Sequence, residues 1–287
     1  MRPVAIVTDS CASLPAQILQ ELNIHWVAYY IHRGQEILRD LVTIQRDEFL
    51  SWLATAKALP TTACPGPGDY FAIYQQLAEE GTTDIVSLHM TSTGSGAYQS
   101  AKVAQEMAEK KLYGLRIEVI DTHTVSLCQG WMVIEAARAA LAGKTLDEIV
   151  VQVKQMIPLT QMMQTADTLK YLYMGGRIGL SQHLVGSLLN IKPLIGIRDG
   201  VVVPLGVARS RLKAYQMMVE MMENAVGKSK IKIAYVHAGA LAEVEKIKQM
   251  VEERVGVAEW FFAELSPALM VHTGPGTAGL CYYKLEA

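Results

Sequence analysis

A short apolar run, a polar loop and a stretch of helical spacing follow one another three times in the first half of the chain. The apolar runs cover residues 4–7, 85–90 and 117–120, and the helical stretches cover 15–22, 96–110 and 129–142. Short apolar runs that end at turn residues are typical of buried strands, and their alternation with helices predicts a parallel sheet covered on both faces. Ligand-binding loops in such a fold lie at the carboxyl ends of the strands.

The loop after the second apolar run, Thr91–Gly96, combines hydroxyl groups and glycines with the start of a helix. Backbone N–H groups at a helix start attract anions, and small residues let a ligand approach closely. The loop has no Lys and fits neither G-x-x-x-x-G-K-[ST] nor G-x-G-x-x-G. We therefore expect it to bind an anion other than a nucleotide, in a crevice of the fold.

Pro158 marks the predicted boundary between two domains, residues 1–157 and 158–287. Before it, a capping box at Thr145 and Glu148 predicts a helix over 146–156. After it, Asp199-Gly200 predicts a hairpin between two short strands. The remaining predicted elements of this second α/β layer are an apolar helix over 183–190, helices over 211–226 and 241–255, a strand over 231–236 and a glycine-rich strand segment over 271–283.

Composition excludes several classes of partner. The chain has 26 Lys and Arg residues against 28 Asp and Glu residues, with no long run of one sign, so nucleic acid is not an expected partner. Its four cysteines form no C-x-x-C pair, which predicts free thiols rather than disulfides or a zinc site. No window approaches the roughly 18 unbroken apolar residues of a membrane span, and the first apolar run is too short for a signal peptide. We expect a soluble, cytoplasmic protein.

Three polar loops carry the candidate binding residues. The first, Thr61–Tyr70, contains Thr61 and Thr62, which are candidates for ligand contact or for a helix cap or turn. In the loop Thr91–Gly96, Ser92 and Ser95 are candidates for ligand contact, for helix capping or for both. The third loop begins with His272 and continues through glycines.

Other chemistry has weaker support in the sequence. Ser95 lies at a strand-to-helix turn, which permits a hydrolase hypothesis with His272 as its base, but the G-x-S-x-G spacing is absent. The seven histidines form no metal-binding pair, so we expect no metal or other cofactor, and His89 is expected in the core. Arg177 and Arg209 follow small residues and are candidates for an exposed salt bridge or for an anionic ligand. The 14 methionines suit either core filling or an adaptable apolar cavity.

Taken together, these segments resemble the DegV family of bacterial fatty-acid-binding proteins. The resemblance covers almost the whole chain, and its specificity comes from eight modest motifs in the right order. They are VTDSCASLP, LPTTACPGPGDY, TSTGSGAYQSA, DTHTVSLCQG, GGRIG, LLNIKPLIGIRDG, VARSRLKA and HTGPGTAGL. The resemblance implies a two-domain α/β fold, with a parallel α/β/α domain followed by a second α/β domain and the ligand between them.

The ligand that the resemblance implies is one long-chain fatty acid, with its tail in an apolar tunnel. The residues that match the family's carboxylate contacts are Thr62, Ser95 and His272, with Thr61 and Ser92 in support. The chain departs from the family pattern at Ala63 and Gly66, which replace serines, and at Ala97, which replaces a threonine. These departures bear on supporting hydrogen bonds and on the preferred acyl chain.

The resemblance also implies a partner, because in the family a separate kinase subunit phosphorylates the bound acid to an acyl phosphate for phospholipid synthesis. By similarity, Arg177 and Arg209 would lie at the mouth of the site and face the kinase or the new phosphate. This chain would then be a binding protein and not an enzyme. The alternatives are a Ser95-dependent hydrolase and an enzyme related to the substrate subunit of dihydroxyacetone kinases, although apolar segments such as 184–197 favour a tunnel over a small polar cavity.

Overall fold

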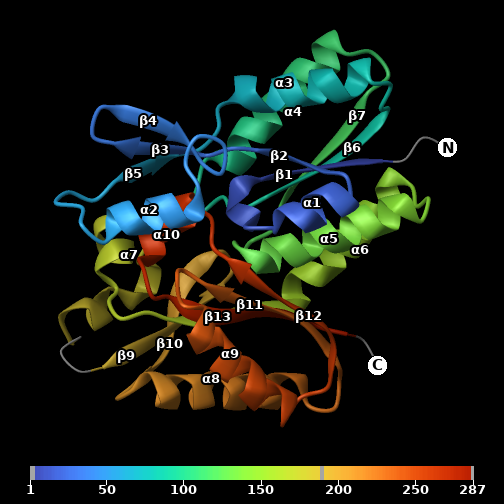
Figure 1. The fold of residues 1–287 in the computed structure, drawn as a ribbon. Helices are drawn as coiled ribbons and strands as arrows, with labels where there is room; N and C mark the ends of the chain where they lie inside the picture. The colour runs from blue at the N-terminus through green and yellow to red at the C-terminus, as the bar shows by residue number, and fades with distance from the viewer. Residues whose placement is uncertain (1–3, 188–190, 286–287) are drawn as a thin grey trace.

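In the part of the chain that the computed structural model describes, residues 4–187 and 191–285, four parallel strands form the sheet of the first half (Figure 1). In spatial order they are β2 (Ile24–Val27), β1 (Ala5–Asp9), β6 (Asp84–His89) and β7 (Arg116–Asp121). The parallel sheet predicted from the apolar runs is confirmed, and Val7, Ile85 and Leu88 are fully buried in it. The edge strand β2 was not predicted, because its four residues alternate too briefly to give a pattern.

Helices cover both faces of this sheet, as predicted. They are α1 (Ala16–Glu21), α3 (Pro67–Glu79), α4 (Ala97–Lys111), α5 (Leu127–Leu141) and α6 (Leu146–Met156). The predicted capping box is present, because Thr145 Oγ1 accepts from the Glu148 N–H and a Glu148 oxygen accepts from the Thr145 N–H. Helix α5 contacts both β1 and β13 (Ala278–Lys284) of the second sheet, so it belongs to the core of both halves. This explains why Trp131 is completely buried.

A small antiparallel sheet and helix α2 (Arg46–Leu53) lie beside the parallel sheet and were not predicted. The strands are β4 (Glu36–Arg39), β3 (Tyr30–Arg33) and β5 (Thr61–Ala63). In β5, Thr61 pairs with His32 and Thr62 pairs with Ile31. The interpretation of Thr61 and Thr62 as a helix cap or turn was therefore wrong, because their backbone is part of a strand ladder.

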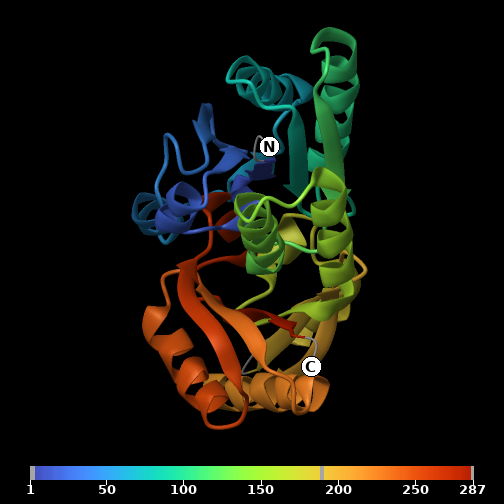
Figure 2. The same cartoon turned by 90° about the vertical axis from the view of Figure 1, so that its right-hand side faces the viewer.

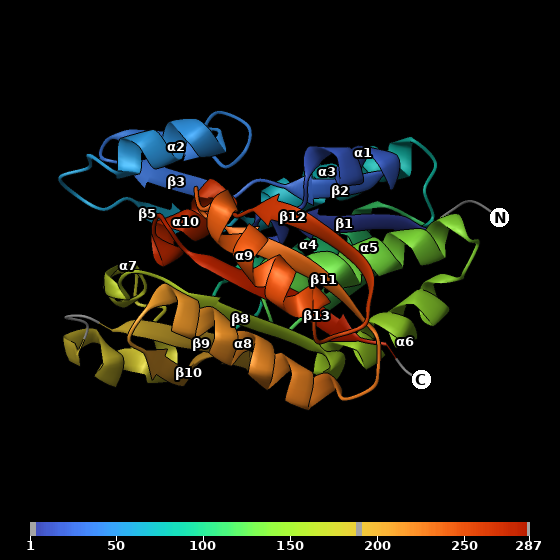
Figure 3. The ribbon, with the colours of Figure 1, turned by 60° about the horizontal axis from the view of Figure 1, so that its bottom comes forward.

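The second half forms a mixed sheet with the order β10-β9-β8-β13-β11-β12, in which only β11 and β12 run parallel among the described strands. Its other strands are β8 (Thr160–Thr165), β9 (Lys192–Arg198), β10 (Val201–Ala208), β11 (Ile231–His237) and β12 (Val257–Glu264). Helices α8 (Arg211–Val226) and α9 (Leu241–Glu252) cover this sheet (Figure 3). The predicted hairpin is confirmed, and Asp199 and Gly200 both have positive φ, as a type I′ turn requires.

Two predictions for the second half gave the wrong type of secondary structure. Residues 183–187 belong to a 3-10 helix, η3 (Gly179–Ser187), rather than to an α-helix, and residues 188–190 lie outside the described residues. Residues 271–273 end helix α10 (Pro267–Thr273) instead of beginning a strand. Ser266 caps α10 and Pro267 occupies its first position, and then Gly274 ends it at a φ of 76°.

The boundary at Pro158 remains a prediction. Pro158 lies in the short 3-10 helix η2 (Ile157–Leu159), which connects α6 to β8. Figure 2 shows the first half (blue to green) above the second (yellow to red), with contacts through α5 and α10. Within the described residues, no helix combines the length and the apolar character that crossing a membrane requires.

Helix α10 is anchored to the first half of the chain by a buried carboxyl group. Asp40 is completely buried, its Oδ1 accepts from the Ala268 N–H at 3.2 Å, and its Oδ2 has no partner among the described residues. Burial raises the pKa of Asp40 from 3.8 to about 6, against the lowering effect of its polar neighbours Ser10, Ala268 and Ser266. A second anchor is the Ser266 N–H, which donates to Ser13 Oγ at 2.9 Å.

Asp40 should give the protein a pH-dependent stability. Between pH 4 and 6 the folded protein binds a proton at Asp40 that the unfolded chain has lost, so the free energy of unfolding falls by up to about 3 kcal/mol as pH rises through this window. Asp40→Asn should remove this pH-dependent loss. The free energy of unfolding of the variant should therefore rise relative to that of the wild type as pH rises. Urea unfolding at several pH values measures this difference in the free energy of unfolding, with Asp47→Asn on the exposed side of α2 as the control. A pH-independent difference between D40N and the wild type would contradict the prediction.

Candidate functional site

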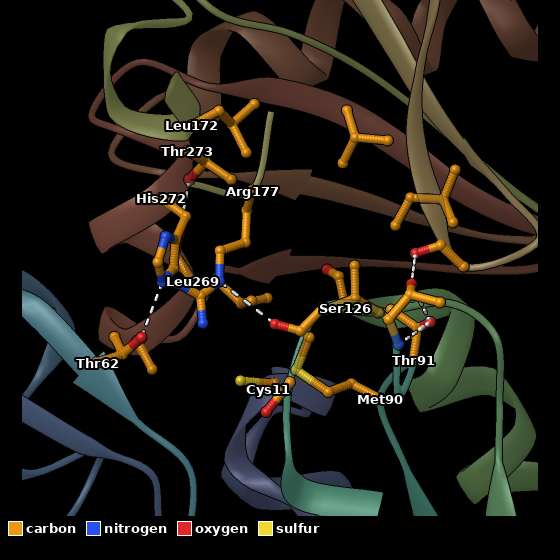
Figure 4. A pocket seen from close by; sticks show the side chains of 18 of the residues that line it. Cys11, Thr62, Met90, Thr91, Ser126, Leu172, Arg177, Leu269, His272 and Thr273 are labelled. Atoms are coloured by element: carbon orange, nitrogen blue, oxygen red, sulfur yellow. Dashed lines mark hydrogen bonds between the residues drawn. The ribbon is translucent and has the colours of Figure 1, made fainter. Parts of the chain in front are cut away.

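A pocket of about 360 Å³ lies between the two halves of the chain, and both contribute to its lining (Figure 4). From the first half come the loop Thr91–Gly96 and the strand β5, and from the second come β9, β10 and α10. The prediction that the loop Thr91–Gly96 lies in a crevice is confirmed. The wall is mostly apolar, with Met90, Met162, Leu172, Ile197 and Leu269 among its residues.

Thr62 and His272 meet at one end of this pocket. Strand β5 presents Thr62, the last turn of α10 presents His272, and Thr62 Oγ1 lies 2.8 Å from His272 Nε2. Thr61 is exposed and does not line the pocket, because successive side chains of a strand point to opposite faces. The structure therefore brings Thr62, but not Thr61, to the site.

Ser95 lies in the same pocket, on a tight turn. The N–H groups of Gly94 and Ser95 both donate to the Thr91 carbonyl, which folds the loop onto itself. Ser95 Oγ accepts from the Ala97 N–H at 3.3 Å and lies 2.7 Å from the Tyr29 hydroxyl. Ser95 thus combines a capping contact at the start of α4 with a place in the pocket.

Ser92 is placed differently from Ser95. Its side chain is exposed and does not line the pocket, and its N–H donates to Asp121 Oδ2 at 3.1 Å. The next residue, Thr93, does line the pocket, and its Oγ1 donates to the Gly200 carbonyl at 2.6 Å, which connects the loop to the β9–β10 hairpin. The structure does not bring Ser92 to the site.

His272 is neutral at physiological pH. Burial lowers its pKa from 6.5 to about 4, and the positive charge of Arg177 lowers it further. Its Nδ1 is buried with no hydrogen-bond partner among the described residues. Gly175 leaves room for the ring, because a Cβ atom at this position would overlap with Nδ1. The imidazole therefore acts in this pocket as a neutral hydrogen-bonding group.

The two predicted arginines occupy different places. Arg177 is exposed and lines the pocket, where its Nε donates to the Gly94 carbonyl at 3.3 Å and its Nη1 donates to the Gly175 carbonyl at 2.8 Å. It thereby connects the Ser95 loop to the segment after α7 (Lys170–Met174). Arg209 is exposed just after β10 and lies outside the pocket lining.

The pocket does not contain the pair that a serine hydrolase requires. Ser95 Oγ is hydrogen-bonded to Tyr29 and Ala97, whereas His272 Nε2 is hydrogen-bonded to Thr62. Among the described residues no hydrogen bond joins Ser95 to His272, so there is no nucleophile with an adjacent base. His89, predicted to be a core residue, is fully buried and hydrogen-bonded to Asp9 and Ser87.

Sequence reasoning missed Tyr29, which lines the pocket beside Ser95. It lies between two short strands that gave no pattern, and it is 66 positions away from Ser95, so no local motif connects them. The methionines divide between the two predicted roles. Met90 and Met162 line the pocket, whereas Met163, Met218 and Met222 belong to the second core.

Fold and site together define the class: an α/β protein whose two halves enclose a largely apolar pocket that is also lined by neutral hydrogen-bonding groups. A family model described as "Uncharacterised protein, DegV family" matches residues 3–285. The chain belongs to the DegV family.

Relatives and solved structures match this chain over nearly its whole length. A DegV domain-containing protein of Streptomyces coelicolor is 33% identical over 280 residues, which cover 97% of this chain and 98% of the relative. The structure titled "Fatty Acid Binding of a DegV family Protein from Thermus thermophilus" has a TM-score of 0.91 at 31% identity and covers 99% of this chain and 100% of that one. The structure of DegV from Bacillus subtilis, titled a fatty acid binding protein, has a TM-score of 0.88 at 26% identity, with coverage of 99% and 100%.

The influence of Arg177 on His272 is measurable. In Arg177→Gln the pKa of His272 should rise from its value of about 4, because a nearby positive charge that opposes protonation of the ring is removed. It should stay below 6.5, because burial is the larger cause of the lowering. NMR titration of the histidine ring signals measures the shift. Arg209→Gln is the matched control and should leave the titration unchanged, and an unchanged His272 pKa in R177Q would contradict the prediction.

Proposed function

We propose that this protein binds a long-chain fatty acid, with the carboxylate at Thr62, Ser95 and His272 and the acyl tail against the apolar wall. The observation that carries the proposal is a mostly apolar pocket whose lining also includes the hydrogen-bonding side chains of Thr62, Ser95 and His272. A fatty acid likewise joins a long apolar tail to one hydrogen-bonding group. The titles of the Thermus thermophilus and Bacillus subtilis structures, which name fatty acid binding in those relatives, support the same assignment.

Neutral donors suit the single charge of a carboxylate. Hydrogen bonds to an ionised acceptor are roughly twice as strong as those between neutral groups, so two hydroxyls and an imidazole can replace much of the water around it. Thr62, Ser95 and His272 supply these groups. The Arg177 guanidinium at the pocket adds favourable charge without being buried.

The tail should supply most of the affinity. Each buried CH₂ contributes about 0.8 kcal/mol, so roughly ten buried methylenes give a gross term on the order of 8 kcal/mol before the costs of binding. The volume of about 360 Å³ lies within the range of roughly 300–1,000 Å³ that is typical of small-molecule sites. The contacts of the carboxylate would then fix the orientation of the acid more than its affinity.

The finer part of the proposal is that the bound acid is presented to a separate kinase, which forms an acyl phosphate. The exposed position of Arg177 beside the proposed carboxylate site supports this role, since a guanidinium can bind two oxygens of one phosphate group at once. Arg209 would face the same partner from outside the pocket. The partner would supply ATP, the pair would work in the cytoplasm, and this chain would carry out no turnover by itself.

Lipid extraction tests the binding proposal directly. Purified protein is denatured and extracted with organic solvent, and the released lipid is identified and quantified by mass spectrometry. We expect near-equimolar long-chain fatty acid, either as purified or after incubation with fatty acids. Protein that remains without lipid after such incubation would contradict the proposal and favour a small polar ligand instead.

Neighbouring threonines provide a matched test of the carboxylate site. Thr62→Val keeps the shape of the side chain and removes a hydroxyl from the pocket, so it should weaken palmitic acid binding by about tenfold, as expected for loss of a hydrogen bond to a charged group. Thr61→Val makes the same change on the exposed face of β5 and should leave binding unchanged. Isothermal titration of delipidated protein measures both. Equal affinity of T62V and T61V would exclude Thr62 from the carboxylate site.

A further inference from the structure

Tyr29 is fixed beside Ser95 by its own backbone. Its N–H donates to Ser10 Oγ at 3.1 Å, and its carbonyl accepts from the Asp40 N–H at 2.9 Å. The side chain is only 4% exposed, lines the pocket, and brings its hydroxyl to 2.7 Å from Ser95 Oγ. Because both backbone groups are bound, the hydroxyl is held in place before any ligand arrives.

The inventory of donors and acceptors decides the direction of this hydrogen bond. A serine hydroxyl can accept two hydrogen bonds and donate one. If Tyr29 accepted from Ser95, its own hydroxyl hydrogen would have no oxygen or nitrogen acceptor among the described residues, and would be left with the neighbouring Cys11 sulfur, which is a weak acceptor. With Tyr29 as the donor, Ser95 Oγ accepts from Tyr29 and from the Ala97 N–H. Its single O–H is then free to point into the pocket.

We propose that Tyr29 is a positioning residue for the head-group site: its hydroxyl donates to Ser95 Oγ and thereby directs the Ser95 O–H toward the ligand carboxylate. This inference rests on the proposed fatty-acid binding. Burial keeps the phenol protonated, because it raises the pKa of Tyr29 well above its ordinary value. Thr62 Oγ1 likewise has a hydrogen-bonding partner in the pocket, His272 Nε2, at 2.8 Å.

The proposed arrangement of Tyr29 and Ser95 favours a ligand group that only accepts hydrogen bonds. A carboxylate only accepts hydrogen bonds, so it benefits from an O–H that is already aimed at it. An alcohol can donate or accept, so it can adapt to a Ser95 hydroxyl that rotates freely. Tyr29 should therefore matter for a fatty acid more than for a fatty alcohol of the same length.

The experiment compares palmitic acid with 1-hexadecanol on delipidated protein. Tyr29→Phe should weaken binding of palmitic acid by about tenfold, through loss of organisation around a charged acceptor, and should change binding of 1-hexadecanol by less than about twofold. Tyr70→Phe is the matched control, because it also removes a buried tyrosine hydroxyl, one that has no partner among the described residues. It should leave both affinities unchanged.

A double-mutant cycle then tests the route through Ser95. If Tyr29 acts through Ser95, adding Y29F to Ser95→Ala should change palmitic acid binding by less than about twofold, although Y29F alone is costly. Three results would overturn the inference: unchanged palmitic acid binding in Y29F, equal losses for the acid and the alcohol, or independent losses in the double mutant. 3-Fluorotyrosine at position 29 preserves the hydroxyl and should retain wild-type binding, and its failure to do so would also count against the inference. If wild-type protein binds no palmitic acid, the proposed function itself fails, which is a distinct result.

Discussion

The rest of the site depends on the contacts of the buried Asp9 carboxyl group. Its Oδ1 accepts from the Cys11 N–H, and its Oδ2 accepts from the Met90 N–H and lies 3.0 Å from His89 Nδ1. Asp9 ends β1 and His89 ends β6, so one side chain fixes the exits of two adjacent parallel strands. Both exits lead to the pocket, since Cys11 and the loop Thr91–Gly96 line it. Loss of Asp9 would leave buried N–H groups unpaired where the loop must be precise.

Local signals specified much of the fold but not the elements that close the site. The capping box before α6 and the Asp199-Gly200 turn act over a few residues, and both gave the correct element. Strand β5 has three residues and exists only because β3 pairs with it, so the information for it lies elsewhere in the chain. Helix α10 is a different case, because Ser266 and Pro267 are a recognisable helix start. The glycines after His272 favoured a loop-and-strand interpretation that obscured this signal.

The site residues show the same difference between local signals and contacts made across the chain. Motif order was enough to select Thr62, Ser95 and His272, which the structure brings to one pocket. Strand alternation decides between Thr61 and Thr62, and this could not be applied without knowing that β5 is a strand. Tyr29 could not be found at all, because its role comes from a contact across 66 positions. Sequence thus identifies residues that belong to motifs, whereas the partners that orient them follow from packing.

The distribution of charge in the pocket suits a ligand that must enter and leave. A buried lysine would hold a carboxylate firmly, but in the empty pocket it would be an unpaired buried charge, which costs several kcal/mol. This pocket avoids that cost, because Thr62, Ser95 and Tyr29 are uncharged and burial lowers the pKa of His272 to about 4. The formal positive charge is placed on Arg177, which is exposed and so is not buried in the empty pocket. An interior of neutral donors with a cation at its surface therefore avoids the cost of an unpaired buried charge when empty and still favours an anion, which suits the proposed binding of a fatty acid.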